Sequence, residues 1–283
     1  MDCKKILIAS MIFANILYCG QAQAAMQAKV AKAQKNYPQI EKLIEYNHYS
    51  DADKMIHDYL QKDPNNLELQ ALRCISMAKQ HKLAPAQTEL DRLLAKHPKN
   101  AQLHYAQGIV YLMRTTSSDV TYIRDTKNLI ENAIKEFVAA VNADSNYYQA
   151  YNAMGVATLR LGNRKDAKDL FQAAIQINPQ YATAYDNMGN VNLIEGNLTE
   201  AENYFNESLK LNSHNPTTMY HLAQVAVRQR DYNKALTWLN HSIHMHPMTS
   251  PALTLQGECY LIQGNQAAAI NSFKKAVNVK PEN

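Results

Sequence analysis

The chain has 283 residues, of which 46% are apolar, a composition that supports a packed fold and excludes a chain without a core. Its formal net charge is only +4, and no run of Lys and Arg occurs downstream of the N-terminus, so the sequence does not favour nucleic-acid binding. It contains only eight Gly and nine Pro residues, so the places where they occur are informative.

The N-terminal segment 1–24 is typical of an export signal. Two lysines precede an apolar run over 6–18, and an Ala-Gln-Ala cleavage motif ends at Ala24. The apolar run is shorter than the roughly 20 residues that a membrane-spanning helix needs. We expect cleavage after Ala24 and export to a periplasm. Secretion from the cell and membrane anchoring, by an uncleaved segment or by a lipid on Cys19, are the alternatives; the bulky Tyr18 disfavours lipidation.

Downstream of the signal, the sequence repeats with a step of 34 residues. A small residue recurs at one place in each repeat, and an aromatic or aliphatic residue follows it four places later. The small residues are Ala52, Ala86, Ala133, Ala167, Ala201, Ala235 and Ala269. The larger ones are Ile56, Leu90, Phe137, Phe171, Phe205, Leu239 and Phe273. A proline near the end of most repeats stops the preceding helix.

This pattern resembles the tetratricopeptide repeat family, whose unit is a pair of antiparallel helices. The resemblance implies an all-α fold, a right-handed α-solenoid of seven such helix pairs. After a short lead over 25–32, the solenoid is expected to occupy 33–283. Its units are expected at 33–66, 67–100, 101–147, 148–181, 182–215, 216–249 and 250–283.

The glycines after residue 24 occupy only two positions of the unit. Gly108, Gly155, Gly189 and Gly257 stand at position 8, and Gly162, Gly196 and Gly264 at position 15. Position 8 lies inside the first helix, where Gly costs about 1 kcal/mol relative to Ala. Its presence there predicts a neighbour that approaches too closely for a side chain. Position 15 lies in the turn between the helices, where Gly supplies a positive φ.

The third unit is longer than the others. The alanine step is 34 residues on both sides of it but 47 between Ala86 and Ala133, which indicates an insertion of 13 residues near 114–126. Insertions between the helices of a repeat often mark a binding face. Tyr122 and Ile123 would form the apolar tip of this loop, unless they extend the following helix.

Cys74 and Cys259 remain after removal of the signal. Because they lie five units apart in a solenoid, they are too distant to form a disulfide. We expect both to be free and buried.

No sequence motif of catalysis or cofactor binding is present, so we expect neither an enzyme nor a cofactor. The best metal-ligand candidates are His241, His244 and His246, at spacings that could place two imidazoles on one ion. Because they fall where the family tolerates exposed polar residues, we interpret them as surface side chains and predict no metal.

The resemblance implies that the inner, concave wall of the solenoid binds another protein or peptide. In this family, positions 2, 5, 9, 12 and 13 of the first helices form that wall. The residues expected to contact the partner are Tyr105, Ile109, Leu112, Asn152, Val156, Arg160, Asp186, Asn190, Leu193, Tyr220, Gln224 and Arg228. Alternatively, the apolar members only shield the floor of a tight superhelix.

The residue patterns of specialised members of the family do not match this wall. The clamp that holds a terminal carboxylate needs Lys and Asn, of which only Asn152 and Asn190 are present. We therefore expect an exported scaffold that binds a partner segment through apolar contacts and a few hydrogen bonds, as in assemblies of pili, secretion systems or the outer membrane. A second hypothesis is homo-oligomerisation through the last unit, which has no capping helix; a metal-binding accessory role is the third.

Overall fold

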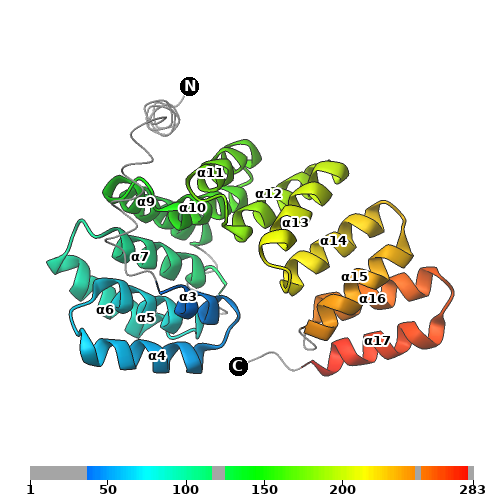
Figure 1. The fold of residues 1–283 in the computed structure, drawn as a ribbon, viewed down its shortest axis with the longest axis horizontal. Coiled ribbons are helices and arrows are strands. Elements are labelled where there is room, and N and C mark those ends of the chain that lie inside the picture. Colours follow the sequence, from blue (N-terminus) through cyan, green and yellow to red (C-terminus); the bar gives the residue numbers. More distant parts are fainter. Residues whose placement is uncertain (1–36, 117–124, 246–249, 280–283) are drawn as a thin grey trace. The chain divides into compact units, whose positions relative to one another are not determined.

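A computed structural model describes residues 37–116, 125–245 and 250–279 of the chain. Within these ranges every regular element is an α-helix and no strand is present (Figure 1). The prediction of an all-α solenoid of seven helix pairs is confirmed. The expected signal over 1–24 and the lead over 25–32 lie outside the described residues. No helix in the described part of the chain is both long and apolar enough to cross a membrane.

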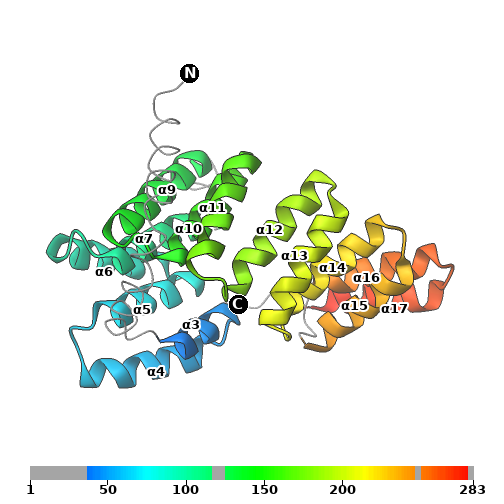
Figure 2. The ribbon, with the colours of Figure 1, turned by 45° about the horizontal axis from the view of Figure 1, so that its top comes forward.

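The chain divides into two compact units, one up to Ser145 and one from Asn146. Each contains consecutive helices that pack as pairs, and Figure 2 shows the same order from a second direction. The helices of the first unit are α3 (Pro38–Glu45), α4 (Tyr49–Lys62), α5 (Leu67–Lys79), α6 (Leu83–Lys96), α7 (Ala101–Arg114) and α9 (Thr126–Ala143). The second unit holds α10 (Tyr148–Arg160), α11 (Arg164–Ile177), α12 (Ala182–Glu195), α13 (Leu198–Leu211), α14 (Pro216–Arg228), α15 (Tyr232–Met245), α16 (Ser250–Ile262) and α17 (Gln266–Asn278).

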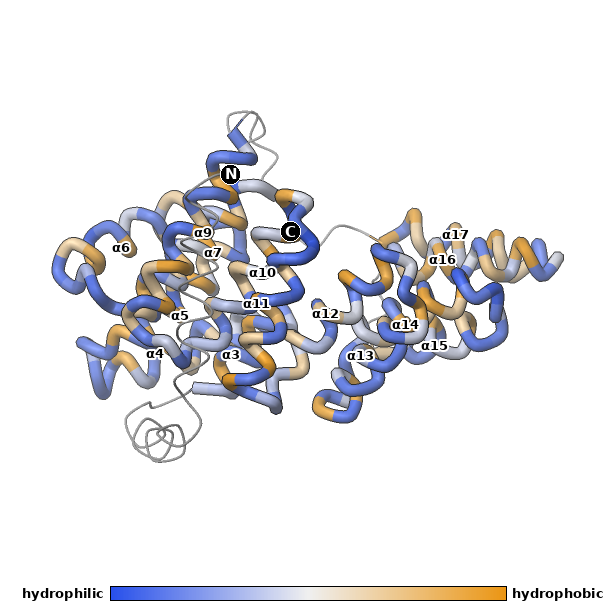
Figure 3. The backbone as a smooth tube through the Cα atoms, turned by 90° about the horizontal axis from the view of Figure 1, so that it is seen from above, coloured by the Kyte–Doolittle hydropathy of each residue, from blue (hydrophilic) through white to orange (hydrophobic). Residues whose placement is uncertain are grey.

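Local sequence signals explain where these helices begin. Side-chain oxygens of Asn66, Asn100, Asn163, Asn215 and Asn265 each accept a hydrogen bond from a backbone N–H in the first turn. Such caps satisfy donors that have no partner inside the helix. Apolar positions recur along each helix between hydrophilic ones (Figure 3), so every helix has a face to bury.

The core of each helix pair forms around the repeated alanine. All seven alanines of this row are at most 1% exposed. Four places later, Phe137, Phe171 and Phe205 are fully buried. The small alanine lets the two helices of a pair approach each other, and the large side chain fills the space beside it.

The prediction that position 8 receives a close neighbour is confirmed, and the neighbour is the aromatic ring of the same helix pair. A Cβ atom at Gly108 would lie 2.4 Å from Phe137, and one at Gly189 would lie 2.6 Å from Phe205. Gly155 and Gly257 meet Phe171 and Phe273 in the same way. Where the larger position holds leucine, position 8 holds a larger residue: Ala223 opposite Leu239 and Cys74 opposite Leu90.

The positive φ expected at position 15 is also confirmed. Gly162, Gly196 and Gly264 have φ of 84°, 85° and 78°. The same turn in the other short pairs is made by non-glycine residues, Asn47, His81 and Arg230, with φ of 61°, 59° and 62°. The left-handed turn is therefore a property of the helix pair, whichever residue occupies it.

The third helix pair differs from the others because α7 ends at Arg114 and α9 begins at Thr126. The helix α9 has 18 residues, whereas the second helices of the other pairs have 13 or 14. Part of the extra sequence therefore lengthens α9 at its N-terminus. Tyr122 and Ile123 lie outside the described residues.

Cys74 and Cys259 are free and buried, as predicted. Burial raises the pKa of the Cys74 thiol to about 12 and also raises that of Cys259. Both therefore carry neutral thiols that serve as small core side chains.

Candidate functional site

The first helices of the second unit, α10, α12, α14 and α16, follow one another through the stack. The helix α12 contacts α10 on one side and α14 on the other. Their paired helices carry the large side chains Phe171, Phe205 and Leu239 and cover one side of them. The side chains that remain at least partly accessible form what we call the first-helix wall: Val156, Arg160, Asn190, Ile194, Tyr220, Gln224, Val227 and Arg228.

Two of the predicted binding residues connect neighbouring first helices instead. Asn187 Nδ2 donates to Asn152 Oδ1 at 2.8 Å. One pair further along, His221 Nδ1 donates to Asp186 Oδ1 at 3.1 Å. Asn152 and Asp186 are only 7% and 8% exposed. Their polar groups are thus used mainly inside the fold, and a partner could reach little of either.

Two predicted leucines lie in the core. Leu112 on α7 is 7% exposed and Leu193 on α12 is 3% exposed. Leu193 packs with Phe205 and Leu222, and its backbone oxygen accepts a hydrogen bond from Arg228 Nη1 at 2.5 Å. Leu193 lies in the last turn of α12, and its carbonyl also accepts a hydrogen bond from the backbone N–H of the C-cap residue Gly196 at 3.1 Å. Arg228 therefore also supports the packing of α14 against α12.

The polar centre of the first-helix wall is Asn190 on α12. Its side chain is half-buried and makes no hydrogen bond to any described residue. On α14, Gln224 Nε2 donates to the Tyr220 hydroxyl at 3.1 Å, which leaves the Gln224 amide oxygen available as an acceptor. Burial, followed by the charge of Glu258, raises the pKa of Tyr220, so this hydroxyl keeps its proton at neutral pH.

Apolar side chains flank this centre. Val156 and Val227 are half-buried, and Ile194 is 42% exposed. Arg160 lies exposed at the end of α10. Amide donors and acceptors next to apolar surface can hydrogen-bond a peptide backbone and cover apolar side chains.

The remaining predicted residues belong to the first unit. Tyr105 and Ile109 lie half-buried on α7 and pack against the core, and the Tyr105 ring lies 5.9 Å from that of Phe137.

His241 and His244 are exposed on α15, whereas His246 lies outside the described residues. Within the part that the structure covers, no three His, Cys, Asp or Glu side chains come close enough together to hold a metal ion.

Sequence reasoning missed the roles of Asn187 and His221. Each lies 35 residues after its hydrogen-bond partner, one more than the repeat step. A search for polar pairs at this offset could have found them. It would have shown that position 5 of one unit faces position 6 of the next.

Models of the tetratricopeptide repeat match residues 148–181, 180–245 and 220–282. Among solved structures, a chain of the APC/C hetero-tetramer Cut9–Hcn1 aligns with a TM-score of 0.73 at 19% identity, over 86% of this chain and 45% of that one. PilW, described as a widely conserved type IV pilus biogenesis factor, has a TM-score of 0.60 at 18% identity, over 74% and 91%. PilF of Pseudomonas aeruginosa has a TM-score of 0.59 at 19% identity, over 72% and 86%. No curated protein sequence matches the chain.

Proposed function

Because the chain belongs to the tetratricopeptide repeat family, we propose that it is an exported, non-enzymatic scaffold that binds a segment of another protein. The segment lies on the first-helix wall of the second unit. The observation that carries this proposal is the Asn190 amide, which is half-buried and has no hydrogen-bond partner among the described residues. Half-buried polar groups usually have a hydrogen-bond partner, and a bound backbone would supply one.

The chemistry of the wall favours an extended segment as the occupant. Asn190 and Gln224 stand at the same position of successive first helices, so their amides form a row across α12 and α14. Such a row can pair with alternate backbone groups, while Val156, Ile194 and Val227 contact the side chains between them. The wall then selects a segment by the shape of its apolar side chains and by hydrogen bonds to its backbone. The segment needs no charged side chain for this contact.

We place this scaffold in the bacterial envelope, where it would assist the assembly of a pilus, a secretion system or the outer membrane. The signal-like pattern of residues 1–24 supports export. The similarity of fold to PilF and PilW is compatible with such a role. Cell fractionation and the mass of the mature chain test the location. A product that begins at residue 25 supports cleaved export, and an intact N-terminus in the cytoplasm contradicts it.

The binding face is tested by the double substitution Asn190→Ala/Gln224→Ala, which removes the row of amides. A matched control, Asn203→Ala/Gln172→Ala, removes the same two residue types from exposed sites on α13 and α11. Affinity purification of tagged chains, with quantification of the co-purified proteins, should show loss of partner with the first pair only. Equal recovery with both pairs, at unchanged thermal stability, would show that the first-helix wall does not bind the partner.

A second candidate function, self-association, rests on the last helix pair. Leu261, Ile262, Ile270 and Val277 are 55%, 59%, 54% and 84% exposed on α16 and α17. Ile175, which corresponds to Val277 in an earlier pair, is only 9% exposed. Light scattering over a concentration series tests this function. A dimer that dissociates with Ile270→Ser/Val277→Ser supports it, and a monomer at high concentration excludes it.

A further inference from the structure

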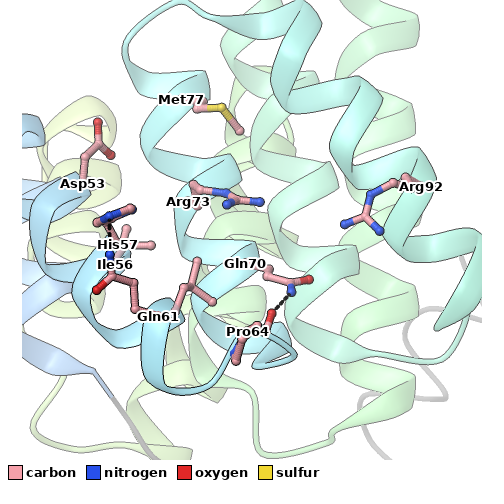
Figure 4. A pocket seen from close by; sticks show the side chains of 10 residues that line it. Asp53, Ile56, His57, Gln61, Pro64, Gln70, Arg73, Met77 and Arg92 are labelled. Carbon is pink, nitrogen blue, oxygen red and sulfur yellow. Dashed lines mark hydrogen bonds between the residues drawn. The ribbon is translucent and has the colours of Figure 1, made fainter.

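A groove of about 610 Å³ lies in the first unit (Figure 4). The helices α4, α5 and α6 and the turn at Pro64 supply its lining. Leu60 and Met77 give it apolar, half-buried surface, and Arg73 and Arg92 give it two guanidinium groups. The groove therefore combines an apolar lining with directional donors, as peptide-binding sites do.

The guanidinium groups share a single carboxylate. Arg92 binds both oxygens of Glu89, through Nε at 2.9 Å and Nη2 at 2.9 Å. Arg73 reaches the same carboxylate only through Nη2, at 2.8 Å. Its other N–H groups have no partner among the described residues, and its side chain is 42% exposed. Arg73 therefore presents free donors in a planar fork that matches a second carboxylate.

The opposite end of the groove is acidic. Asp53 accepts hydrogen bonds from Ser76 Oγ at 2.6 Å and from Gln80 Nε2 at 2.9 Å, but no cation pairs with it in the described chain. In Figure 4, Asp53 and Arg92 lie at opposite ends, with Arg73 and Met77 between them. A ligand that carries a large negative charge would be repelled by Asp53 and Glu89, whereas a single carboxylate beside Arg73 would meet the net positive charge that two guanidinium groups and one carboxylate leave there.

The lining also contains a buried acceptor without a donor. Gln70 is only 9% exposed, and its Nε2 donates to the Pro64 carbonyl at 2.6 Å. That bond fixes the orientation of the amide, because only the NH₂ group can donate to a carbonyl. The Oε1 atom is then left without a hydrogen-bond partner within the described residues. Buried acceptors without a hydrogen bond are rare in folded proteins. A ligand that donates a hydrogen bond to such an acceptor removes the free-energy cost of leaving it unsatisfied.

We propose that this groove is a second protein-binding site, which takes a peptide segment that carries one Asp or Glu next to an apolar residue. The carboxylate binds Arg73, the apolar side chain packs on Leu60 and Met77, and the peptide runs toward Asp53. The site is separate from the first-helix wall, so it does not depend on the function proposed above. It would let the scaffold hold two segments, or two partners, at once.

A phage-displayed library of random 12-residue peptides, selected on the full chain, tests this proposal. Enriched peptides should carry Asp or Glu beside Leu, Ile, Val, Met or Phe, and they should fail to bind the Arg73→Gln variant. This substitution leaves the Arg92–Glu89 pair in place, which limits any loss of stability. The control Arg164→Gln removes an exposed arginine from α11 and should change nothing.

A selected peptide is then synthesised with capped ends in three forms, with Asp, with Asn and with phosphoserine at the acidic position. Fluorescence anisotropy should show that Asn for Asp, or Gln for Arg73, weakens binding by about tenfold or more. The wall variant Asn190→Ala/Gln224→Ala should bind the Asp peptide unchanged. Recovery of no Arg73-dependent peptide, equal affinities for the Asp and Asn forms, or tightest binding of the phosphoserine form would each overturn the proposal.

Discussion

Substitution of Gly189 by Ala in α12 tests the closest contact of the fold. A Cβ atom there would lie 2.6 Å from two ring atoms of Phe205, whereas ordinary contacts begin at 3.4 Å. The ring would have to retreat by roughly 0.8 Å. It is fully buried against Leu193, Leu222 and Val225, which leave it little room. Overpacking of this kind costs about 1–3 kcal/mol.

Alanine has an opposing effect, because it is the better helix former. Replacement of Gly inside a helix gains about 1 kcal/mol in the absence of steric conflict. The difference between these two terms is roughly 0–2 kcal/mol, and because a contact of 2.6 Å is shorter than real Cβ contacts we expect Gly189→Ala to lower the free energy of unfolding by about 2 kcal/mol, the upper end of this range. The reverse substitution Ala223→Gly, at the same position of α14, meets no ring, since Leu239 stands opposite it. It should cost only the helix propensity, about 1 kcal/mol.

Urea unfolding followed by the fluorescence of Trp238 measures the effect, because this tryptophan packs against the cluster that contains Phe205. The double variant Gly189→Ala/Phe205→Leu recreates the Ala223–Leu239 combination. It should show a favourable coupling of about 1 kcal/mol or more relative to the two single variants. An unchanged or raised midpoint for Gly189→Ala, or simple additivity in the double variant, would refute the claim that ring volume determines position 8.

Three further outcomes are expected. Arg230→Gly should raise the free energy of unfolding by about 1 kcal/mol in the same urea assay, because φ is 62° and glycine adopts this conformation without strain; a loss of stability would show that the arginine side chain contributes there. The hydrogen bond that His104 Nδ1 donates to Glu136 raises the pKa of His104, so the contribution of this pair to stability is full below the unfolded pKa of about 6.5 and is lost as pH rises through the folded pKa. Glu136→Gln should therefore destabilise the chain more at pH 5.5 than at pH 8 in thermal unfolding, and equal losses at both would contradict the assignment. In a chain that lacks Cys3, Cys19 and Cys259, Ellman's reagent at pH 8 should react slowly with Cys74 until urea is added, since burial raises its pKa to about 12; fast native labelling would show that α5 opens.

The helix pairs could be predicted from the sequence because the repeated glycines mark either a close contact or a left-handed turn. Gly189 marks the place where the Phe205 ring arrives, and Gly196 marks the left-handed turn. Both requirements act on the backbone within one helix pair, so glycine recurs at the same positions of the repeat. The turn at Arg230 could not be predicted in this way. The helix pair imposes the same left-handed conformation there on an arginine, a residue type that does not indicate such a turn.

The proposed binding face could be predicted from the sequence only as one side of the first helices. The spacing of position 5 and position 9 places Asp186 and Asn190 on one side of α12, but it does not say which neighbour each side chain meets. That depends on how far one first helix is shifted along the next. In the structure this shift brings His221 to Asp186 and leaves Asn190 without a partner among the described residues.

This shift divides the wall into two rows with different physical roles. At position 5, Asn152 and Asp186 are buried, and they connect α10 to α12 and α12 to α14. Removal of such a group leaves a partner unsatisfied and costs stability. The row at position 9 is more accessible, and Asn190 and Gln224 keep hydrogen-bonding capacity that the fold does not use. Substitutions along this row should therefore alter the proposed binding face without loss of the solenoid, because the hydrogen bonds that connect these first helices lie one turn away.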